Sequence, residues 1–262
     1  GQGADEQLAG YHSGYARHLA GLVRRGRASE ALRIMRERAA LAGVPLQAQL
    51  ARLAAVLLPS GLAKTLRGRR MAALHPWLGT EAFRPFAGAL SPQDAAVEEL
   101  GLPPVRDIGS WCLAMTHASN LPMLLHWEDR NSMAHSVEAR VPFVDHPLVE
   151  FTLGLHSEHK FAAAETKRVL RRAMAGVLPR KVAERRDKLG FATPEAEWVR
   201  GPLGALALEG VEATVRRWPG LLEGPSARAM VGAMVAGRRA VDPSLWRIIN
   251  LGIWGETFAV QA

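Results

Sequence analysis

Apolar residues recur every three or four positions along most of this chain, and regular alternation of apolar and polar residues is scarce. A repeat of that length is the period of amphipathic α-helices. Ser91 followed by Pro92 predicts the start of a helix, with Ser91 as the N-cap and Pro92 at the first helical position. The chain is therefore expected to be mainly α. The pattern predicts further helices over 4–25, 28–42, 45–58, 108–125, 145–155 and 165–177, and a last one after residue 243.

Residues 121–147, LPMLLHWEDRNSMAHSVEARVPFVDHP, depart from this period, because charged and apolar residues are mixed without a common face. A solvated helix would keep its charges on one side. Mixed in this way, several of the charges should lie partly buried, where each needs a partner. Such a stretch is typical of an active-site wall, and equally of an internal salt-bridge cluster that braces a pair of helices.

Several short motifs follow one another across roughly 190 residues of the chain. The first reads GQGADE and is followed by Gly10-Tyr11. The second is EDRNSMAHSVEARVPFVDH at 128–146, and then come TKRVLRRAMAGVLP at 166–179 and RRDKLGFATP at 185–194. In this order the motifs closely resemble the synthetase half of the glutamine-dependent asparagine synthetases.

The resemblance implies a fold as well as a domain organisation. Residues 1–262 would be the C-terminal portion of one synthetase domain, namely the helical part of an adenine-nucleotide α-hydrolase-like (PP-loop ATP pyrophosphatase) α/β domain. The chain begins within a motif and without an initiator Met, and no SGG.DSS phosphate loop occurs in it. We therefore expect a fragment, inactive alone, whose partners are the upstream half of the synthetase domain and a glutaminase domain. A homodimer is left open.

The reaction implied by the resemblance is the ATP-dependent amidation of aspartate. Its cofactors are ATP and Mg²⁺, its intermediate is β-aspartyl-AMP, and ammonia from glutamine completes it. Lys188 matches a lysine that lies beside the α-phosphate and the leaving pyrophosphate in similar enzymes, where it would stabilise the developing charge. Glu128 has the spacing from Lys188 at which related β-lactam-forming synthetases carry a Glu that helps to deprotonate the attacking nitrogen.

The N-terminal motif is a glycine turn that leads into a helix. Backbone N–H groups at such a turn favour an anion, so Gly1, Gln2 and Gly3 are candidates for binding ATP or pyrophosphate. The carboxylate of Asp5 is a ligand type that Mg²⁺ prefers, and by resemblance it matches the second metal-binding Asp of the family. From the residues alone, an N-capping Asp remains the simpler interpretation. Gln2 cannot take up a proton, which argues against a general base there.

The remaining candidates surround Glu128. Asp129 and Arg130 follow it directly and are expected to contact substrate or to line the wall. Glu138 and Arg140 are interpreted as a buried ion pair that holds the wall, although Arg140 would orient a carboxylate bidentately if it faced the pocket.

Charge is concentrated between Lys160 and Lys188, where ten basic residues stand against three acidic ones, a net +7 of the +8 carried by the whole chain. This concentration favours a polyanionic partner. Nucleic acid is disfavoured, because no aromatic residues are interleaved for base stacking. Many of these charges would simply form a solvated helix face.

Composition narrows the class of protein further. The chain is 48% hydrophobic and can support a sizeable core, and its single cysteine, Cys112, excludes a disulfide framework and lies in an apolar run typical of an inert buried thiol. No apolar run approaches the roughly 20 residues of a membrane span, so a cytoplasmic protein without a membrane partner is expected.

Two other functions are compatible with the same residues. One keeps the adenylation but uses an intramolecular amine as nucleophile, which would give a lactam or a macrocycle. The other is a non-catalytic helical module that binds anions through its basic face.

Overall fold

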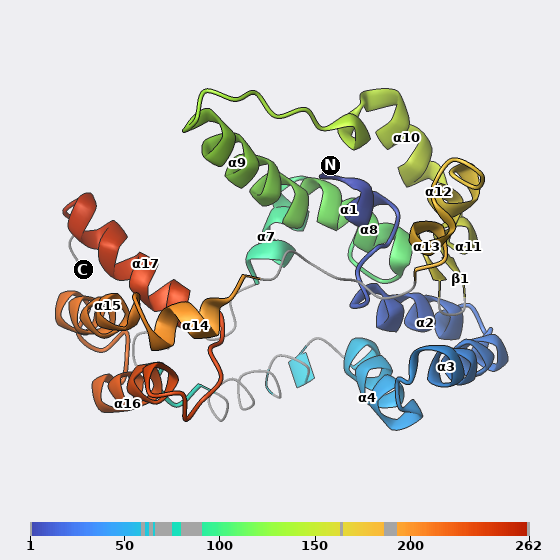
Figure 1. The fold of residues 1–262 in the computed structure, drawn as a ribbon. Coiled ribbons are helices and arrows are strands. Elements are labelled where there is room, and N and C mark those ends of the chain that lie inside the picture. The colour runs from blue at the N-terminus through green and yellow to red at the C-terminus, as the bar shows by residue number, and fades with distance from the viewer. Residues whose placement is uncertain are drawn as a thin grey trace. The chain divides into compact units, whose positions relative to one another are not determined.

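The computed structural model describes residues 2–58, 61–62, 65, 75–79, 91–162, 165–185 and 193–260. The described residues form two compact units (Figure 1). The first combines residues 1–59 and 90–188, and the second combines 60–89 and 189–262. Each unit has its own hydrophobic core.

The first unit is built almost entirely from helices. Three of them pack together early in the chain, namely α2 (Gly14–Arg24), α3 (Ala28–Ala42) and α4 (Leu46–Leu57). The others are α1 (Ala4–Gln7), α7 (Pro92–Glu99), α8 (Ile108–His117), α9 (Asn120–Met133), the 3-10 helix η2 (Pro142–Val144), α10 (His146–Gly154), α11 (Ser157–Lys160), α12 (Arg168–Ala173) and α13 (Arg180–Ala183). The strands β1 (Phe161–Ala162) and β2 (Glu165–Thr166) pair antiparallel, with Phe161 opposite Thr166.

The core of the first unit is formed by α2, α3, α4 and α8 around one aromatic contact. The rings of Tyr15 and Phe161 meet edge to face with their centroids 4.1 Å apart. Ile108 and Cys112 on α8 are completely buried in the same cluster. The complete burial of Cys112 confirms the prediction of a buried thiol.

The second unit contains α14 (Glu195–Arg200), α15 (Gly204–Arg217), α16 (Gly224–Val235) and α17 (Ser244–Thr257). Helices α15 and α17 cross closely, because glycines stand at the crossing. A Cβ atom added at Gly252 would lie 2.7 Å from the hydroxyl oxygen of Thr214. That hydroxyl donates to the carbonyl of Ile248 across the crossing, at 2.7 Å. The spacing of Trp246, Ile249 and Ile253 predicts one apolar stripe on α17, but Ile249 is buried whereas Ile253 is 45% exposed.

The mainly α prediction is confirmed, whereas several helix boundaries are wrong. The helix expected over 4–25 is interrupted after Gln7, because Ala9 adopts a positive φ of 55° and Gly10 follows it. The helix expected over 108–125 ends at His117. Pro122 lacks an N–H and its ring would clash with the carbonyl four residues earlier, so the turn that contains it starts a new helix. The helix expected from residue 165 begins at Arg168, after β2.

The N-cap predicted at Ser91 is confirmed. Its side chain accepts a hydrogen bond from the backbone N–H of Asp94 at 3.1 Å, and Pro92 occupies the first turn. Among the described helices, none combines the length and the apolar character that crossing a bilayer requires.

Candidate functional site

Helix α1 has only four residues, yet it contacts two of the distant motifs, at Phe143 and at Lys167. It begins at Gly3, which has a left-handed φ of 104°. A side chain at Gly3 would be strained by that φ and would lie 3.1 Å from a methyl group of Val144. Glu6 and Gln7 are each only 1% exposed. A helix of four residues has little stability of its own, so these buried contacts hold it in place.

Gln7 joins α1 to the end of the VEARVPFVDH motif. Its Nε2 donates to the backbone carbonyl of Phe143 at 2.7 Å, and its Oε1 accepts from the hydroxyl of Thr152 on α10 at 2.6 Å. Both ends of the amide are thereby satisfied in a buried environment, where an unpaired polar group would be costly.

Asp5 joins α1 to the TKRVLRR motif. Its carboxylate lies 3.1 Å from the Nζ atom of Lys167, and both side chains are partly exposed. Lys167 itself has a positive φ of 54°, at the start of α12. Gly10 packs directly against this ion pair. A Cβ atom at Gly10 would lie 1.9 Å from the Asp5 carboxylate and 2.4 Å from Cε of Lys167. The glycine of the Gly10-Tyr11 pair is thus required by packing.

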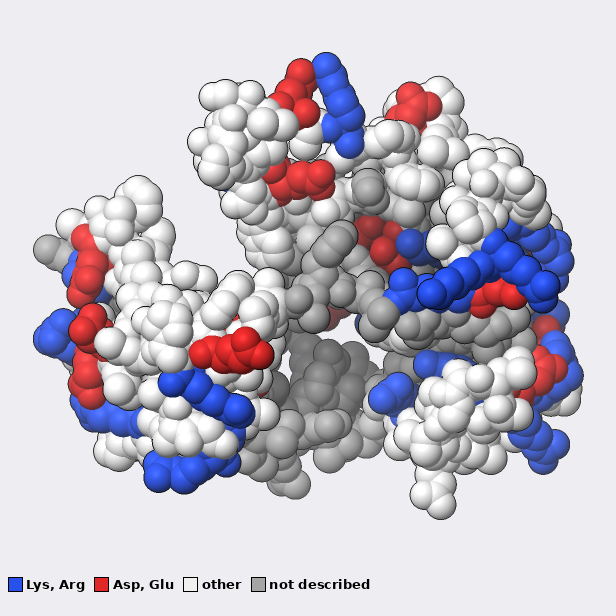
Figure 2. Space-filling model, viewed as in Figure 1, with Lys and Arg blue, Asp and Glu red and all other residues white. Residues whose placement is uncertain are grey.

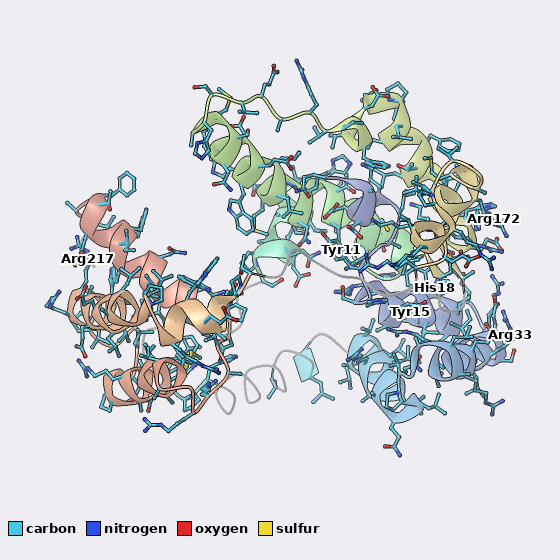
Figure 3. All side chains as sticks on the ribbon, viewed as in Figure 1. Tyr11, Tyr15, His18, Arg33, Arg172 and Arg217 are labelled. Carbon is cyan, nitrogen blue, oxygen red and sulfur yellow. The ribbon has the colours of Figure 1, made fainter. Side chains whose placement is uncertain are left out.

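Glu6 binds the other residue of that pair. The hydroxyl of Tyr11 donates to Oε1 of Glu6 (Figure 3 labels Tyr11). The pKa of the Tyr11 phenol is raised above its usual value, first by burial and then by this hydrogen bond to Glu6. Tyr11 therefore remains a neutral donor across the physiological range.

The wall expected over 121–147 is more exposed than its sequence indicated. Leu121 is the single residue of α9 that is buried, so the later turns of this helix extend from the core of the first unit (Figure 1). Asp129 and Arg130 are exposed, and Glu128 is half-buried. The pair expected between Glu138 and Arg140 does form, at 2.9 Å, but the two side chains are 68% and 79% exposed. The prediction that this pair is buried is wrong.

Glu128 nevertheless has one unusual feature. Its Oε2 atom is shielded from solvent and has no hydrogen-bond partner among the described residues. A buried carboxylate oxygen without a donor is unfavourable unless a ligand supplies one. Oε2 of Glu128 could therefore accept a hydrogen bond from an N–H group of a ligand.

The basic segment is partly structural. Figure 2 shows Lys and Arg gathered on the first unit near α12 and α13. Arg171 donates to the backbone carbonyls of Thr166 and Ala183, which ties α12 to α13. Lys160 is completely buried and donates to the carbonyl of Leu153 at 3.3 Å, and burial lowers its pKa. Lys160 therefore does not belong to a solvated face.

Two of the predicted site residues, Gly1 and Lys188, lie outside the described residues. Gln2 is half-buried next to the turn at Gly3. Sequence reasoning assigned no role to Gln7 or Lys167, although both make the long-range contacts of α1. Gln7 directly follows the GQGADE motif, and this position was the signal in the sequence that could have marked it as a site residue.

The described residues do not form a complete metal site. No group of three or more His, Cys, Asp or Glu side chains is found among them. Asp5 is the candidate that fits in part, because its carboxylate is partly exposed, and Mg²⁺ in phosphate-binding enzymes takes only one or two carboxylates beside phosphates and water.

Comparison with known proteins agrees with this arrangement of motifs. The family model described as asparagine synthase matches residues 1–256. The chain therefore belongs to the asparagine synthase family, and it represents the synthetase domain of that family.

Individual relatives match over shorter segments. The chain is 38% identical over 78 residues to asparagine synthetase [glutamine-hydrolyzing] 3 of Bacillus subtilis (strain 168), which is 30% of this chain and 13% of that protein. It is 32% identical over 132 residues to a putative asparagine synthetase [glutamine-hydrolyzing] of Mycobacterium bovis, covering 50% of this chain and 20% of that protein. The chain thus matches no more than a fifth of the length of these relatives. No solved structure matches.

Proposed function

We propose that residues 1–262 form the C-terminal portion of an asparagine synthetase domain that amidates aspartate with ATP. The observation that carries the proposal is the set of contacts made by α1. Asp5 pairs with Lys167, and Gln7 binds Phe143 and Thr152, so the N-terminal motif is joined to two distant motifs of the same family. Relatives named as glutamine-hydrolysing asparagine synthetases support the same substrate and nitrogen source.

The proposed reaction has two steps. An oxygen of the aspartate β-carboxylate attacks the α-phosphorus of ATP, the bond to the bridging oxygen breaks, and pyrophosphate leaves. The nitrogen of ammonia then attacks the acyl carbon of β-aspartyl-AMP, AMP leaves with the electron pair of the C–O bond, and the nitrogen loses a proton. Bound Mg²⁺ would neutralise phosphate charge, and Asp5 is the residue of this chain that would hold it.

The residues of this chain divide between the two steps. Lys188 would stabilise charge on the α-phosphate and on the leaving pyrophosphate, with Gly1, Gln2 and Gly3 close to the phosphates. Glu128 would accept a hydrogen bond from the incoming nitrogen, because its Oε2 has no other donor. Asp129, Arg130, Glu138 and Arg140 would line the approach to it. The phosphate loop of the PP-loop domain and the glutaminase domain are proposed to lie in the remainder of the protein.

An exchange assay separates these roles. In the full-length protein, we expect aspartate-dependent exchange of label between pyrophosphate and ATP. Lys188→Ala should abolish this exchange, whereas Lys181→Ala, on the exposed helix α13, should leave it intact. Glu128→Gln should keep the exchange and reduce asparagine formation, because only the second step needs the carboxylate. Glu98→Gln, on the exposed side of α7, is its control.

The other outcomes of this assay contradict the proposal in different ways. Exchange with another carboxylic acid, but not with aspartate, would indicate a cyclase of the same family that uses an internal amine. The absence of exchange with every acid would favour a non-catalytic anion-binding module.

A further inference from the structure

A pocket in the first unit lies between α2, α3 and α4, and no residue of α1 lines it. Its volume is about 450 Å³, within the range of small-molecule sites. Its walls are mostly apolar, and basic side chains from two helices reach it. The lining includes Tyr15 and Leu19 on α2, Arg38 on α3, and Arg52 and Val56 on α4.

Arg38 is the unusual residue of this pocket. It is only 5% exposed, and no described residue accepts a hydrogen bond from its guanidinium group or places a carboxylate beside it. Its guanidinium carbon lies 3.6 Å above the centre of the Tyr15 ring, a cation–π contact that offsets only part of the cost of burying a charge. A buried arginine normally has an anionic partner. The guanidinium nitrogens of Arg38 are not among the solvent-shielded polar atoms that lack a partner, so they remain open to the pocket.

Arg52 adds a second positive charge to this pocket. Arg52 lines the same pocket and also has no ion pair with any described residue. The positive charge of Arg52 lowers the pKa of Arg38, after the larger effect of burial, so the two guanidinium groups repel each other. Gln49 brings no compensating charge, and its Nε2 already donates to the carbonyls of Met35 and Val44.

From this geometry we infer that the pocket between α2, α3 and α4 binds a small organic oxyanion, with the anionic group on Arg38 and Arg52 and an apolar body against Leu19 and Val56. A carboxylate and a phosphate monoester share this chemistry, and both match the planar fork of arginine donors. The site does not depend on the proposed reaction, because α1, Lys167 and Glu128 are not among its lining residues.

The test is calorimetric titration of the chain at low ionic strength, without ATP or Mg²⁺. The probes are benzoate and phenyl phosphate, which distinguish the two sources of negative charge, and benzamide, which has the same ring without a charge. At least one anion should bind, benzamide should not, and added salt should weaken the binding. Failure of the aspartate-dependent exchange would leave this result unaffected.

Two arginine variants on the same helix make the test specific. Arg38→Met keeps the aliphatic length and removes the charge, and it should weaken anion binding at least tenfold. Arg36→Met, on the exposed side of α3, should bind as the unchanged protein does. Without ligand, Arg38→Met should unfold at the same or a higher temperature, because an unpaired buried cation has been removed.

The inference is overturned if neither anion binds at millimolar concentration, or if Arg38→Met binds as tightly as Arg36→Met. If Arg38→Met does not fold, Arg52→Met takes its place, since Arg52 is exposed and its loss should also weaken binding.

Discussion

Replacing Gln7 with Met tests whether α1 is held by its buried hydrogen bonds. Met has nearly the volume of Gln, so the change leaves no large cavity and removes only the amide. Two short hydrogen bonds are lost, at 2.7 Å to the carbonyl of Phe143 and at 2.6 Å from the hydroxyl of Thr152.

The two lost bonds do not have equal consequences. The hydroxyl of Thr152 also lies 3.2 Å from the carbonyl of Val149, so it retains an acceptor when Gln7 is replaced. The carbonyl of Phe143 loses the donor it has from Gln7 in a partly buried position, and its desolvation is then uncompensated. With about 1–3 kcal/mol for the unsatisfied group and about 1 kcal/mol for the other bond, we expect a loss of about 2–4 kcal/mol.

Urea unfolding followed by circular dichroism measures the free energy of unfolding, and hydrogen exchange of peptides from α1 and α10 localises the change. Gln47→Met, at an exposed position of α4, is the matched control and should change stability by less than about 0.5 kcal/mol. In a double-mutant cycle, Gln7→Met and Thr152→Val should couple by about 1 kcal/mol. A loss no larger than that of the control would refute the view that these bonds fix α1.

Three further predictions follow from single sites. Gly10→Ala should push apart Asp5 and Lys167, since the new methyl group would lie 1.9 Å from the carboxylate, and should cost about 1–3 kcal/mol in urea unfolding; an unchanged midpoint would contradict the packing argument. Burial lowers the pKa of His18 to about 4, so the native state favours its neutral form. Stability should be fully present above the unfolded pKa of about 6.5 and should fall by roughly 3 kcal/mol as the pH drops to 4, a loss that His18→Gln should largely remove. Burial also raises the pKa of the Cys112 thiol to about 11, so a thiol reagent at pH 8 should label it only in the unfolded chain, and rapid labelling of native protein would show that the thiol is accessible.

The sequence was informative where one physical signal dominates. The helical period located α3 and α4 to within a residue or two, and the Ser-Pro pair located the start of α7. The helical period failed at the interruption after Gln7, because the completely buried Ala9 adopts a positive φ that an alanine rarely takes. Pro122 was a local signal for the end of α8 that the apolar run concealed.

The candidate site was predictable in composition but not in its contacts. Asp5 was identified as a site residue, yet its pairing with Lys167 joins residues far apart in the chain, and no local pattern specifies such a pair. The mixed pattern of 121–147 was interpreted as partial burial, whereas most of its charges are exposed, because α9 contributes only Leu121 to a core. Glu128 alone keeps the buried carboxylate oxygen that the interpretation required.

The long reach of α1 has a consequence for how the chain folds. The partners of Gln7 lie 136 and 145 residues further along the chain, while α1 has only four residues with which to form a helix. Such a helix cannot persist by itself, and closing so long a loop is entropically costly. At about 5–20 residues per second, synthesis of the residues between α1 and its partners in η2 and α10 takes roughly 7–30 seconds. Although α1 is translated before its partners, it should be among the last parts of the first unit to acquire native structure.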